Sequence, residues 1–285
     1  GVAMFAKPTA ELLYVNVWVI VIIAGGLMTA SAYYGIKAIE IVSFISVPLI
    51  AILGTYSMVS ATADGGGLSA IFAKSTGMGV VSAVGLVVGS FVSGGSATPN
   101  FTRFAKSTSS AVITTVVAFF LGNTLMFSFG AVGGAFTGKD DIFYVMIAQG
   151  LAIPAMWGLG ANIWTTNNNA LYTTGLGYAN ITKIPKKPLV LVAGILGTLA
   201  ALWLYDNFVG WLNILNATLP PVGTVLIVDY FARRRSYSAG IVAFKWVPVL
   251  SILAGALVGW FVKDLGIPAI NAMVTTVVVY LGGMA

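Results

Sequence analysis

Long stretches without any charged side chain are the feature that most constrains the fold of this chain. No Asp, Glu, Lys or Arg lies between Lys106 and Lys139, or between Asp141 and Lys183. Charged residues make up 8% of the chain, whereas a typical soluble domain has about 25%. Because so few charges cannot cover a water-exposed surface, a soluble globular enzyme is excluded. Continuous apolar runs favour membrane-spanning helices, since the strands of a membrane β-barrel alternate instead.

Two residue types that carry much enzyme chemistry are missing from the sequence. It contains neither His nor Cys, which excludes a His- or Cys-ligated zinc site, a thiol nucleophile, a disulfide and a Ser-His-Asp triad. The apolar runs also hold no nucleophile–base pair and no paired carboxylates. We therefore predict that the protein is not an enzyme and carries no cofactor.

The apolar runs predict an all-α integral membrane protein, because a spanning helix needs about 20 apolar residues. We expect one polytopic domain over residues 1–285, with a short apolar stub at residues 1–6 followed by nine spans. The run after Asp141 is long enough to hold a helix and a re-entrant or interfacial continuation. The nine predicted spans are residues 12–36, 41–63, 80–100, 108–136, 146–172, 188–205, 208–229, 244–262 and 267–285.

The basic residues predict the orientation of these spans. If the loops alternate sides, one side holds ten Lys and Arg residues and the other holds four, so the first side is cytoplasmic by the positive-inside rule. The C-terminus is then cytoplasmic, and the basic charge reflects topology rather than nucleic-acid binding. The cytoplasmic set is Lys37, Arg103, Lys106, Lys183, Lys186, Lys187, Arg233, Arg234, Arg235 and Lys245, and the other set is Lys7, Lys74, Lys139 and Lys263.

This orientation has a consequence for the beginning of the chain. The first full span would enter the membrane from outside, yet the sequence starts at Gly1 with no initiator Met and no signal-peptide pattern. We therefore expect an upstream part to be missing, with the stub as the end of another span.

Glycine and serine gather at membrane depth in residues 88–96, with the sequence VGSFVSGGS. Gly costs about 1 kcal/mol relative to Ala in a helix interior, and broken helices mark substrate sites in secondary transporters. An unwound substrate site is one interpretation of this segment, and close helix packing through small residues is the other. For the pairs Gly85 with Gly89 and Gly255 with Gly259, packing is the better explanation.

A second polar segment, residues 162–169, has the sequence NIWTTNNN. Residues 162, 165, 166 and 169 share one helical face, and unpaired amides are expensive in lipid. The hydroxyls of Thr165 and Thr166, with a carbonyl near Asn162, form a set of neutral oxygens that suits Na⁺. Hydrogen bonding between helices without an ion is the alternative.

The polar groups at depth predict the kind of ligand. Phe91 offers an aromatic face for a planar ring, and Ser and Asn supply donors and acceptors without net charge. The spans have no charged residue near their centres, which argues against a proton relay or an ionic substrate. These features favour a small, neutral, planar and polar molecule, while simple packing remains the alternative for Phe91.

Several motifs together resemble the nucleobase–cation symporter family, in particular its bacterial cytosine permeases. Residues 88–93 and the long segment 162–180 carry most of this resemblance, which runs along nearly the whole chain. It implies a LeuT-type fold of two inverted five-helix repeats that lacks its first two spans and most of the third. The other matching stretches are residues 118–123, 146–150, 201–212 and 220–235.

The resemblance also implies a role for individual residues. Phe91 would stack on the base, Ser90, Ser93 and Asn167 would hydrogen-bond it, and Asn162, Thr165 and Thr166 would bind sodium. The remaining groups of the site would lie upstream of Gly1, so this chain by itself is not expected to transport. At position 168 the family pattern has Asp, where this chain has Asn168.

The implied function is sodium-coupled uptake of cytosine by alternating access, carried out by a monomer in the bacterial inner membrane. Two alternatives remain open at this point. One is a sodium symporter for a related neutral heterocycle, such as a purine, allantoin or hydantoin. The other is a hydrophobic subunit of a larger complex that does not transport on its own.

Overall fold

The computed structural model describes residues 1–34, 36–232, 245–262 and 265–284, without the side chains of residues 36–39. Every regular element in these ranges is a helix, which confirms the all-α prediction. The chain divides into two compact units, and each is described by itself. Unit 1 comprises Gly1–Thr76 and Lys106–Asp206, and unit 2 comprises Gly77–Ala105 and Asn207–Ala285. The single domain expected over the whole chain stays a prediction.

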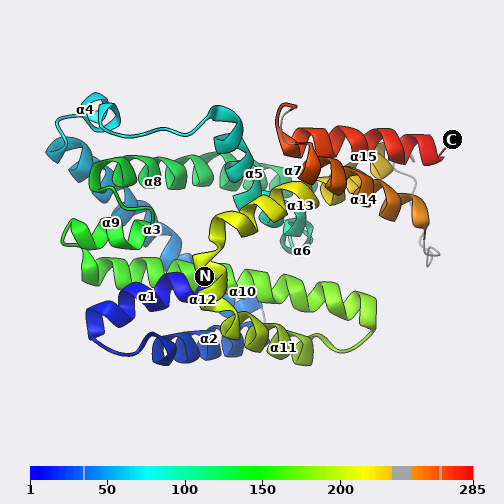
Figure 1. Cartoon of the computed structure of the whole chain (residues 1–285). Helices are drawn as coiled ribbons and strands as arrows, with labels where there is room; N and C mark the ends of the chain where they lie inside the picture. The colour runs from blue at the N-terminus through cyan, green and yellow to red at the C-terminus, as the bar shows by residue number, and fades with distance from the viewer. Residues whose placement is uncertain (35, 233–244, 263–264, 285) are drawn as a thin grey trace. The chain divides into compact units, whose positions relative to one another are not determined.

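Unit 1 is a bundle of helices that are far apart in the sequence (Figure 1). Its elements are α1 (Val2–Leu13), α2 (Val17–Tyr34), α3 (Ile36–Asp64), α4 (Leu68–Ala73), α7 (Thr108–Val116), η1 (Val117–Gly122), α8 (Asn123–Thr137), α9 (Ile142–Ala148), α10 (Ala152–Thr182), α11 (Lys186–Leu199) and α12 (Ala201–Asp206). The long helix α10 packs against α2, α3 and α11, and α2 also packs against α1. Helix α8 packs against α3, α4 and α9. The π-helical turn η1 lies within the run that joins α7 to α8.

The core of unit 1 holds the short helix α9 in place. Phe143 and Met146 of α9 are each 1% exposed and pack with Ile50 of α3 and Leu159 of α10. Asp141 caps the helix, because its carboxylate accepts the backbone N–H of Phe143 at 2.9 Å. A helix of seven residues is too short to be stable alone, so these tertiary contacts hold it.

Three predicted boundaries are wrong, and local backbone geometry explains two of them. The span predicted at 146–172 begins instead at Ala152 and continues to Thr182 as one helix. The short helix α9 precedes it in the same apolar run, and a re-entrant or interfacial part of that run stays a prediction. Gly150 has φ +77°, a conformation that favours glycine, so the chain turns there between α9 and α10. The stub belongs to α1, which ends where Tyr14 turns left-handed. The span predicted at 188–205 is divided at Ala200 into α11 and α12.

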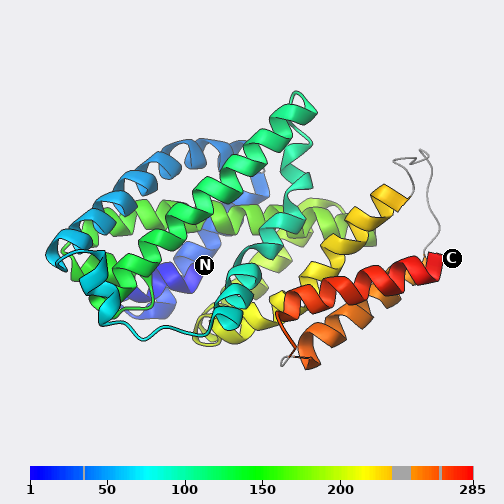
Figure 2. The ribbon, with the colours of Figure 1, turned by 90° about the horizontal axis from the view of Figure 1, so that it is seen from above.

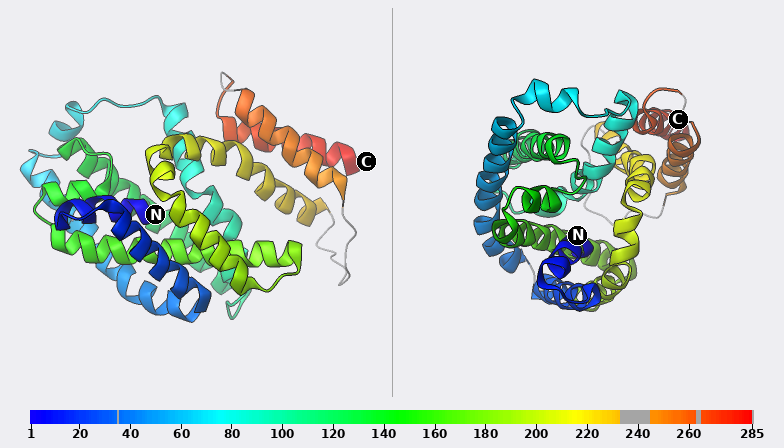
Figure 3. Two further views of the ribbon diagram at one scale, coloured as in Figure 1. Left: turned by 60° about the horizontal axis from the view of Figure 1, so that its bottom comes forward. Right: turned by 60° about the vertical axis from the view of Figure 1, so that its left-hand side comes forward.

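Unit 2 contains the Gly- and Ser-rich helix and the C-terminal helices (Figures 2 and 3). Its elements are α5 (Val80–Ala97), α6 (Pro99–Thr102), α13 (Phe208–Ala232), α14 (Trp246–Phe261) and α15 (Pro268–Met284). Helix α13 packs against α5, α14 and α15, and α14 lies alongside α15. Helix α13 continues through Pro220 and Pro221.

Glycine makes the contact between α5 and α13 possible. Gly85 and Gly89 are buried on α5. A Cβ on Gly85 would lie 3.2 Å from Nδ2 of Asn216, and a Cβ on Gly89 would overlap the backbone oxygen of Leu212. The prediction that this pair serves helix packing is confirmed.

The second glycine pair plays the same role on α14. A Cβ on Gly259 would lie 2.9 Å from Cβ of Ala272 on α15, and one on Gly255 would lie 2.7 Å from the backbone oxygen of Ala272. Packing through small residues is therefore confirmed for this pair as well.

Several helices of the described residues are long and apolar enough to cross a membrane. Five of them have at least 18 residues, and two further apolar helices are shorter. Their number, length and apolar composition are those of a multi-pass membrane protein. The five are Val17–Tyr34, Glu40–Asp64, Val80–Thr102, Thr108–Thr137 and Phe208–Ala232, and the shorter two are Trp246–Phe261 and Pro268–Met284.

Some of the basic residues used to predict the orientation lie outside the described residues. They are Arg233, Arg234, Arg235 and Lys263, together with the side chain of Lys37.

Candidate substrate and ion sites

The predicted base-binding residues lie on α5, whose backbone is regular. The helix runs unbroken from Val80 to Ala97, so the interpretation of residues 88–96 as an unwound segment is wrong. The hydroxyl of Ser90 donates to the carbonyl of Val87 at 2.8 Å. This bond within the helix satisfies the serine without any break in the backbone.

Phe91 is placed on the side of α5 away from α13. It follows Gly89 by two residues, which is about 200° around a helix of 3.6 residues per turn. Its side chain is 40% exposed, and Ser93 is also exposed. The aromatic face of Phe91 is therefore partly accessible, as a stacking role requires, and that role stays a prediction.

The predicted sodium ligands lie on α10 in unit 1. The hydroxyl of Thr165 donates to the backbone carbonyl of Asn162 at 2.9 Å, and Thr165 is 4% exposed. Thr166 is exposed. Two of the three predicted ligand oxygens, the Thr165 hydroxyl and the Asn162 carbonyl, thus lie next to one another. The third, the Thr166 hydroxyl, projects from the residue that follows Thr165. The chemistry of this set, neutral hydroxyl and carbonyl oxygen, fits a hard monovalent cation.

Asn167 and Asn168 both turn towards neighbouring helices of unit 1. Nδ2 of Asn167 donates to Sδ of Met28 on α2 at 3.0 Å. Asn168 is fully buried and its Oδ1 accepts from Oγ of Ser31 at 3.0 Å, while its Nδ2 has no partner among the described residues. The amide of Asn167 is therefore engaged with α2, and its predicted role in binding the base is not tested by this contact.

A polar chain between α2 and α10 was not predicted from the sequence. The indole N–H of Trp164 donates to Ser31 Oγ at 2.8 Å, and the same hydroxyl donates to Asn168. The spacing of Trp164 and Asn168, four residues apart on one helix, puts them on the same face. A serine in an otherwise apolar span was the only signal for Ser31, and its partner could not be known without the fold.

Gln149, in the matching stretch 146–150, has a structural role. Ser57 of α3 donates its hydroxyl to Oε1 of Gln149 at 2.5 Å, and Nε2 of Gln149 donates to the backbone carbonyl of Ser57 at 3.0 Å. This paired contact ties the α9–α10 turn to α3.

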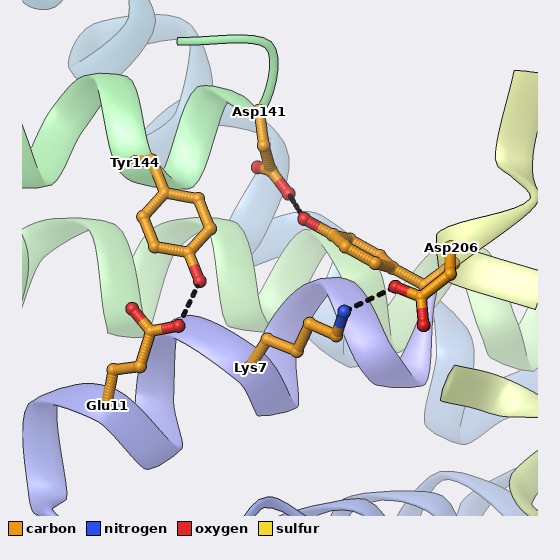
Figure 4. Close-up of polar contacts among 6 residues, drawn as sticks. Lys7, Glu11, Asp141, Tyr144 and Asp206 are labelled. Carbon is orange, nitrogen blue, oxygen red and sulfur yellow. Dashed lines mark hydrogen bonds and ion pairs between the residues drawn. The ribbon is translucent and has the colours of Figure 1, made fainter. Parts of the chain in front are cut away.

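A polar network at one end of unit 1 joins α1, α9 and α12 (Figure 4). Lys7 pairs with Asp206 at 2.5 Å, and the hydroxyl of Tyr144 donates to Glu11 at 2.7 Å. The hydroxyl of Tyr205 donates to Asp141 at 3.0 Å, and the ammonium of Lys7 lies 4.4 Å from the centre of its ring. Lys7, Asp141 and Asp206 come from segments that the alternating loops assign to one side of the membrane.

Asp141 is the buried carboxyl of this network. Burial raises its pKa above the ordinary value, against the opposing effect of the hydrogen bonds from Phe143 and Tyr205, and the nearby Asp140 adds to the rise.

The predicted site residues thus form two sets in different units. Ser90, Phe91 and Ser93 lie in unit 2, and the α10 set lies in unit 1. The α10 set consists of Asn162, Thr165, Thr166 and Asn167.

Comparison with known proteins was made on sequence and on structure. The family described as permeases for cytosine and purines, uracil, thiamine and allantoin matches residues 6–245. The cytosine permease of Escherichia coli strain K12 is 46% identical over 287 aligned positions, which cover 99% of this chain and 68% of that protein. The cytosine permease of Escherichia coli O157:H7 matches to the same extent.

A solved structure supports the fold independently. Mhp1, a nucleobase-cation-symport-1 family transporter in a closed conformation with bromovinylhydantoin bound, superposes with a TM-score of 0.77 at 18% identity. The match covers 99% of this chain and 71% of Mhp1. The sequence matches point to a transporter rather than an enzyme, and the chain belongs to the family of permeases for cytosine and purines, uracil, thiamine and allantoin.

Proposed function

We propose that this protein takes part in sodium-coupled uptake of cytosine by alternating access. The observation that carries the substrate is the 46% identity to the Escherichia coli cytosine permeases along 99% of the chain. The Mhp1 fold supports a transporter that binds a planar, neutral heterocycle.

The accessible residues of α5 support base binding. Phe91 is partly exposed, and Ser93, two residues further along the same helix, is exposed as well. A base stacked on Phe91 would gain about 1–3 kcal/mol from the aromatic contact. The hydroxyls of Ser90 and Ser93 would pair with polar edges of the ring, and Asn167 would add an amide.

The α10 oxygens support the coupling ion. Thr165 Oγ1 and the carbonyl of Asn162 are 2.9 Å apart, and the Thr166 hydroxyl would complete a set of neutral ligands. Coupling requires that sodium binds more tightly to the state that is competent to bind the base, and linkage then makes the base strengthen sodium binding equally. Rocking of one helix bundle against another around the two ligands would alternate the access.

The proposed setting is the bacterial inner membrane, with the C-terminus in the cytoplasm and the transporter as a monomer. The excess of Lys and Arg in the loops assigned to the cytoplasm supports this orientation.

Uptake of radiolabelled cytosine by cells that express the complete gene, including any sequence that precedes this chain, tests the proposal. We expect uptake to depend on sodium and to fail in potassium medium, and unlabelled cytosine to compete better than hypoxanthine, allantoin or hydantoin. Stronger competition by one of those three would reassign the substrate. Copurification with other membrane subunits and no sodium effect would instead favour the non-transporting alternative.

The Thr166→Ala variant tests the ion site. Loss of the hydroxyl removes one proposed ligand at an exposed position, so we expect sodium stimulation to be abolished, while Thr166→Ser, which keeps the hydroxyl, retains it. Full sodium stimulation in the alanine variant would place the ion elsewhere.

A further inference from the structure

Three lysines, Lys183, Lys186 and Lys187, gather where α10 ends and α11 begins, and we call this place the lysine corner (Figure 1). No acidic residue occurs between Asp141 and Asp206, so neither helix supplies a carboxylate to it. Lys183 and Lys187 form no ion pair within the part of the chain that the structure describes. The corner therefore carries positive charge that these residues do not neutralise.

Aromatic rings hold two of the three lysines in place. Nζ of Lys186 lies 4.4 Å from the centre of the Tyr172 ring on α10, and Nζ of Lys187 lies 5.0 Å from that of Tyr33 on α2. Both distances are within the range of a cation–π interaction. The stem of Lys186 also passes Gly175, where a Cβ would lie 2.9 Å from its Cγ. Two ammonium groups thus have defined places, whereas a topological role requires only charge in the loop.

The position of the lysines is unfavourable for α11 itself. Cations are stabilised at the C-terminal end of a helix, but Lys186 and Lys187 are the first two residues of α11. The first turn of this helix has no acidic residue and no side-chain cap. The positive end of the helix dipole therefore adds to the charge of the lysines, and a negative group would be stabilised beside them.

An apolar strip continues from Lys187 along the exposed side of α11. It consists of Leu191, Ile195 and Leu199, which follow at intervals of four residues and are therefore neighbours on the helix surface. Their side chains are 41%, 58% and 64% exposed. From Lys187 to Leu199 the helix rises about 18 Å, close to half the hydrocarbon thickness of a bilayer, which is about 15 Å. A cation at the start of such a strip matches a lipid headgroup followed by an acyl chain.

We propose that the lysine corner binds the phosphate of an anionic phospholipid whose acyl chain lies on the apolar strip. Lys183 donates one N–H to the carbonyl of Asn180 at 2.7 Å, and its ammonium has two more to offer. The proposed orientation puts the corner in the cytoplasmic leaflet, which carries anionic lipid. The strip favours a lipid over a soluble anion, which has no use for an apolar surface. The site uses none of the residues proposed to bind the base or sodium, so it goes beyond the proposed transport.

Native mass spectrometry of the complete purified protein with added lipid tests the proposal. We expect phosphatidylglycerol to bind more tightly than phosphatidylcholine. Lys187→Gln should weaken phosphatidylglycerol binding by about fivefold, the contribution of one lysine beside anionic headgroups. The matched control is Lys106→Gln, at an exposed lysine assigned to the same side of the membrane, which should leave the affinity unchanged. Equal weakening by both variants, or equal binding of the two lipids, would overturn the proposal.

Variants of Tyr33 test whether the ring holds the lysine for the lipid. Tyr33→Phe keeps the aromatic face and should bind phosphatidylglycerol like the wild type. Tyr33→Leu removes that face and should bind about two- to fivefold more weakly. Equal affinities of the two variants would overturn the role of the ring and, with it, the defined place of the lysine in this site.

Glycerol phosphate separates a lipid from a soluble anion. It carries a phosphate without acyl chains, so we expect it not to displace phosphatidylglycerol, and displacement at equal concentration would overturn the lipid proposal in favour of a free phosphate. Ile195→Asn puts an amide on the apolar strip without changing the charge and should weaken lipid binding. Unchanged binding in that variant, or an acidic protein retained in place of lipid, would also contradict the proposal. None of these measurements uses cytosine or sodium, so they stand or fall separately from the proposed transport.

Discussion

Ser31 is the residue through which α2 and α10 share a buried polar contact. It accepts the N–H of Trp164 at 2.8 Å and donates to Asn168 at 3.0 Å. We expect Ser31→Ala to destabilise the protein by about 1–3 kcal/mol, because both partners are left unpaired at depth. Thermal unfolding in detergent measures this loss. Ser75→Ala, at an exposed serine in a loop, is the control, and an equal effect of both variants would contradict the prediction.

The raised pKa of Asp141 predicts that the stability of the protein depends on pH. Because burial raises its pKa in the folded protein, the native state binds the proton more tightly than the unfolded chain, whose Asp titrates near about 3.9. The free energy of unfolding therefore falls as the pH rises from that value through the raised pKa, and is level above it. Asp141→Asn remains neutral and keeps a side-chain oxygen for the helix cap.

The measurement is the difference in unfolding free energy between Asp141→Asn and wild type over this pH range. We expect the difference to move in favour of the Asn variant as the pH rises and to become constant once the folded protein has lost the proton. A difference that does not change with pH would show that the carboxyl is not perturbed in the folded state.

The glycines of α5 differ in whether the neighbouring helix leaves room for a side chain. A Cβ on Gly89 would overlap the backbone of α13, whereas a Cβ on Gly95 would meet nothing within 4 Å. We expect Gly89→Ala to destabilise the protein by about 1–3 kcal/mol through overpacking. Gly95→Ala should stabilise it by about 0.5–1 kcal/mol, because alanine favours the helix. Unfolding of both variants under the same conditions gives the comparison, and a neutral Gly89→Ala would contradict this packing.

The same contact explains how α5 stays helical. Three glycines and three serines in residues 88–96 suggest a weak helix by propensity alone. Gly89 is required where α13 approaches, and the Ser90 hydroxyl bonds within its own helix. Tertiary contact thus overrides the local preference for a break.

Orientation in the membrane is a property of the whole molecule. The chain is well suited to a direct measurement of this orientation. It contains no Cys, so single-cysteine variants label at one site. Ser75 and Ala105 are exposed in loops on either side of α5, and the charge distribution assigns Ser75 to the outside and Ala105 to the cytoplasm. A membrane-impermeant maleimide should label Ser75→Cys in intact cells, and Ala105→Cys only after permeabilisation. The reverse pattern would invert the proposed topology.

From the sequence alone come the membrane setting, the all-helical class, the family and most of the helix positions. These follow from the length of the apolar runs and the position of the charges. A bilayer forces an apolar run of sufficient length to form a helix, because its backbone groups find no water there, and this depends little on the rest of the fold. The glycine pairs were also predictable, because small residues four apart on a helix have few roles other than close approach.

Only the tertiary structure decided which polar groups are engaged and which are left unpaired among the described residues. Neighbouring asparagines of one segment have different partners on α2, since Asn167 contacts Met28 and Asn168 contacts Ser31. The positive φ of Gly150 breaks the predicted span. A hydropathy pattern carries no information about backbone angles, so this break could not be predicted from it. The unpaired oxygen of Asn216 is likewise invisible in the sequence, because the satisfaction of a buried polar group depends on distant segments that folding brings beside it.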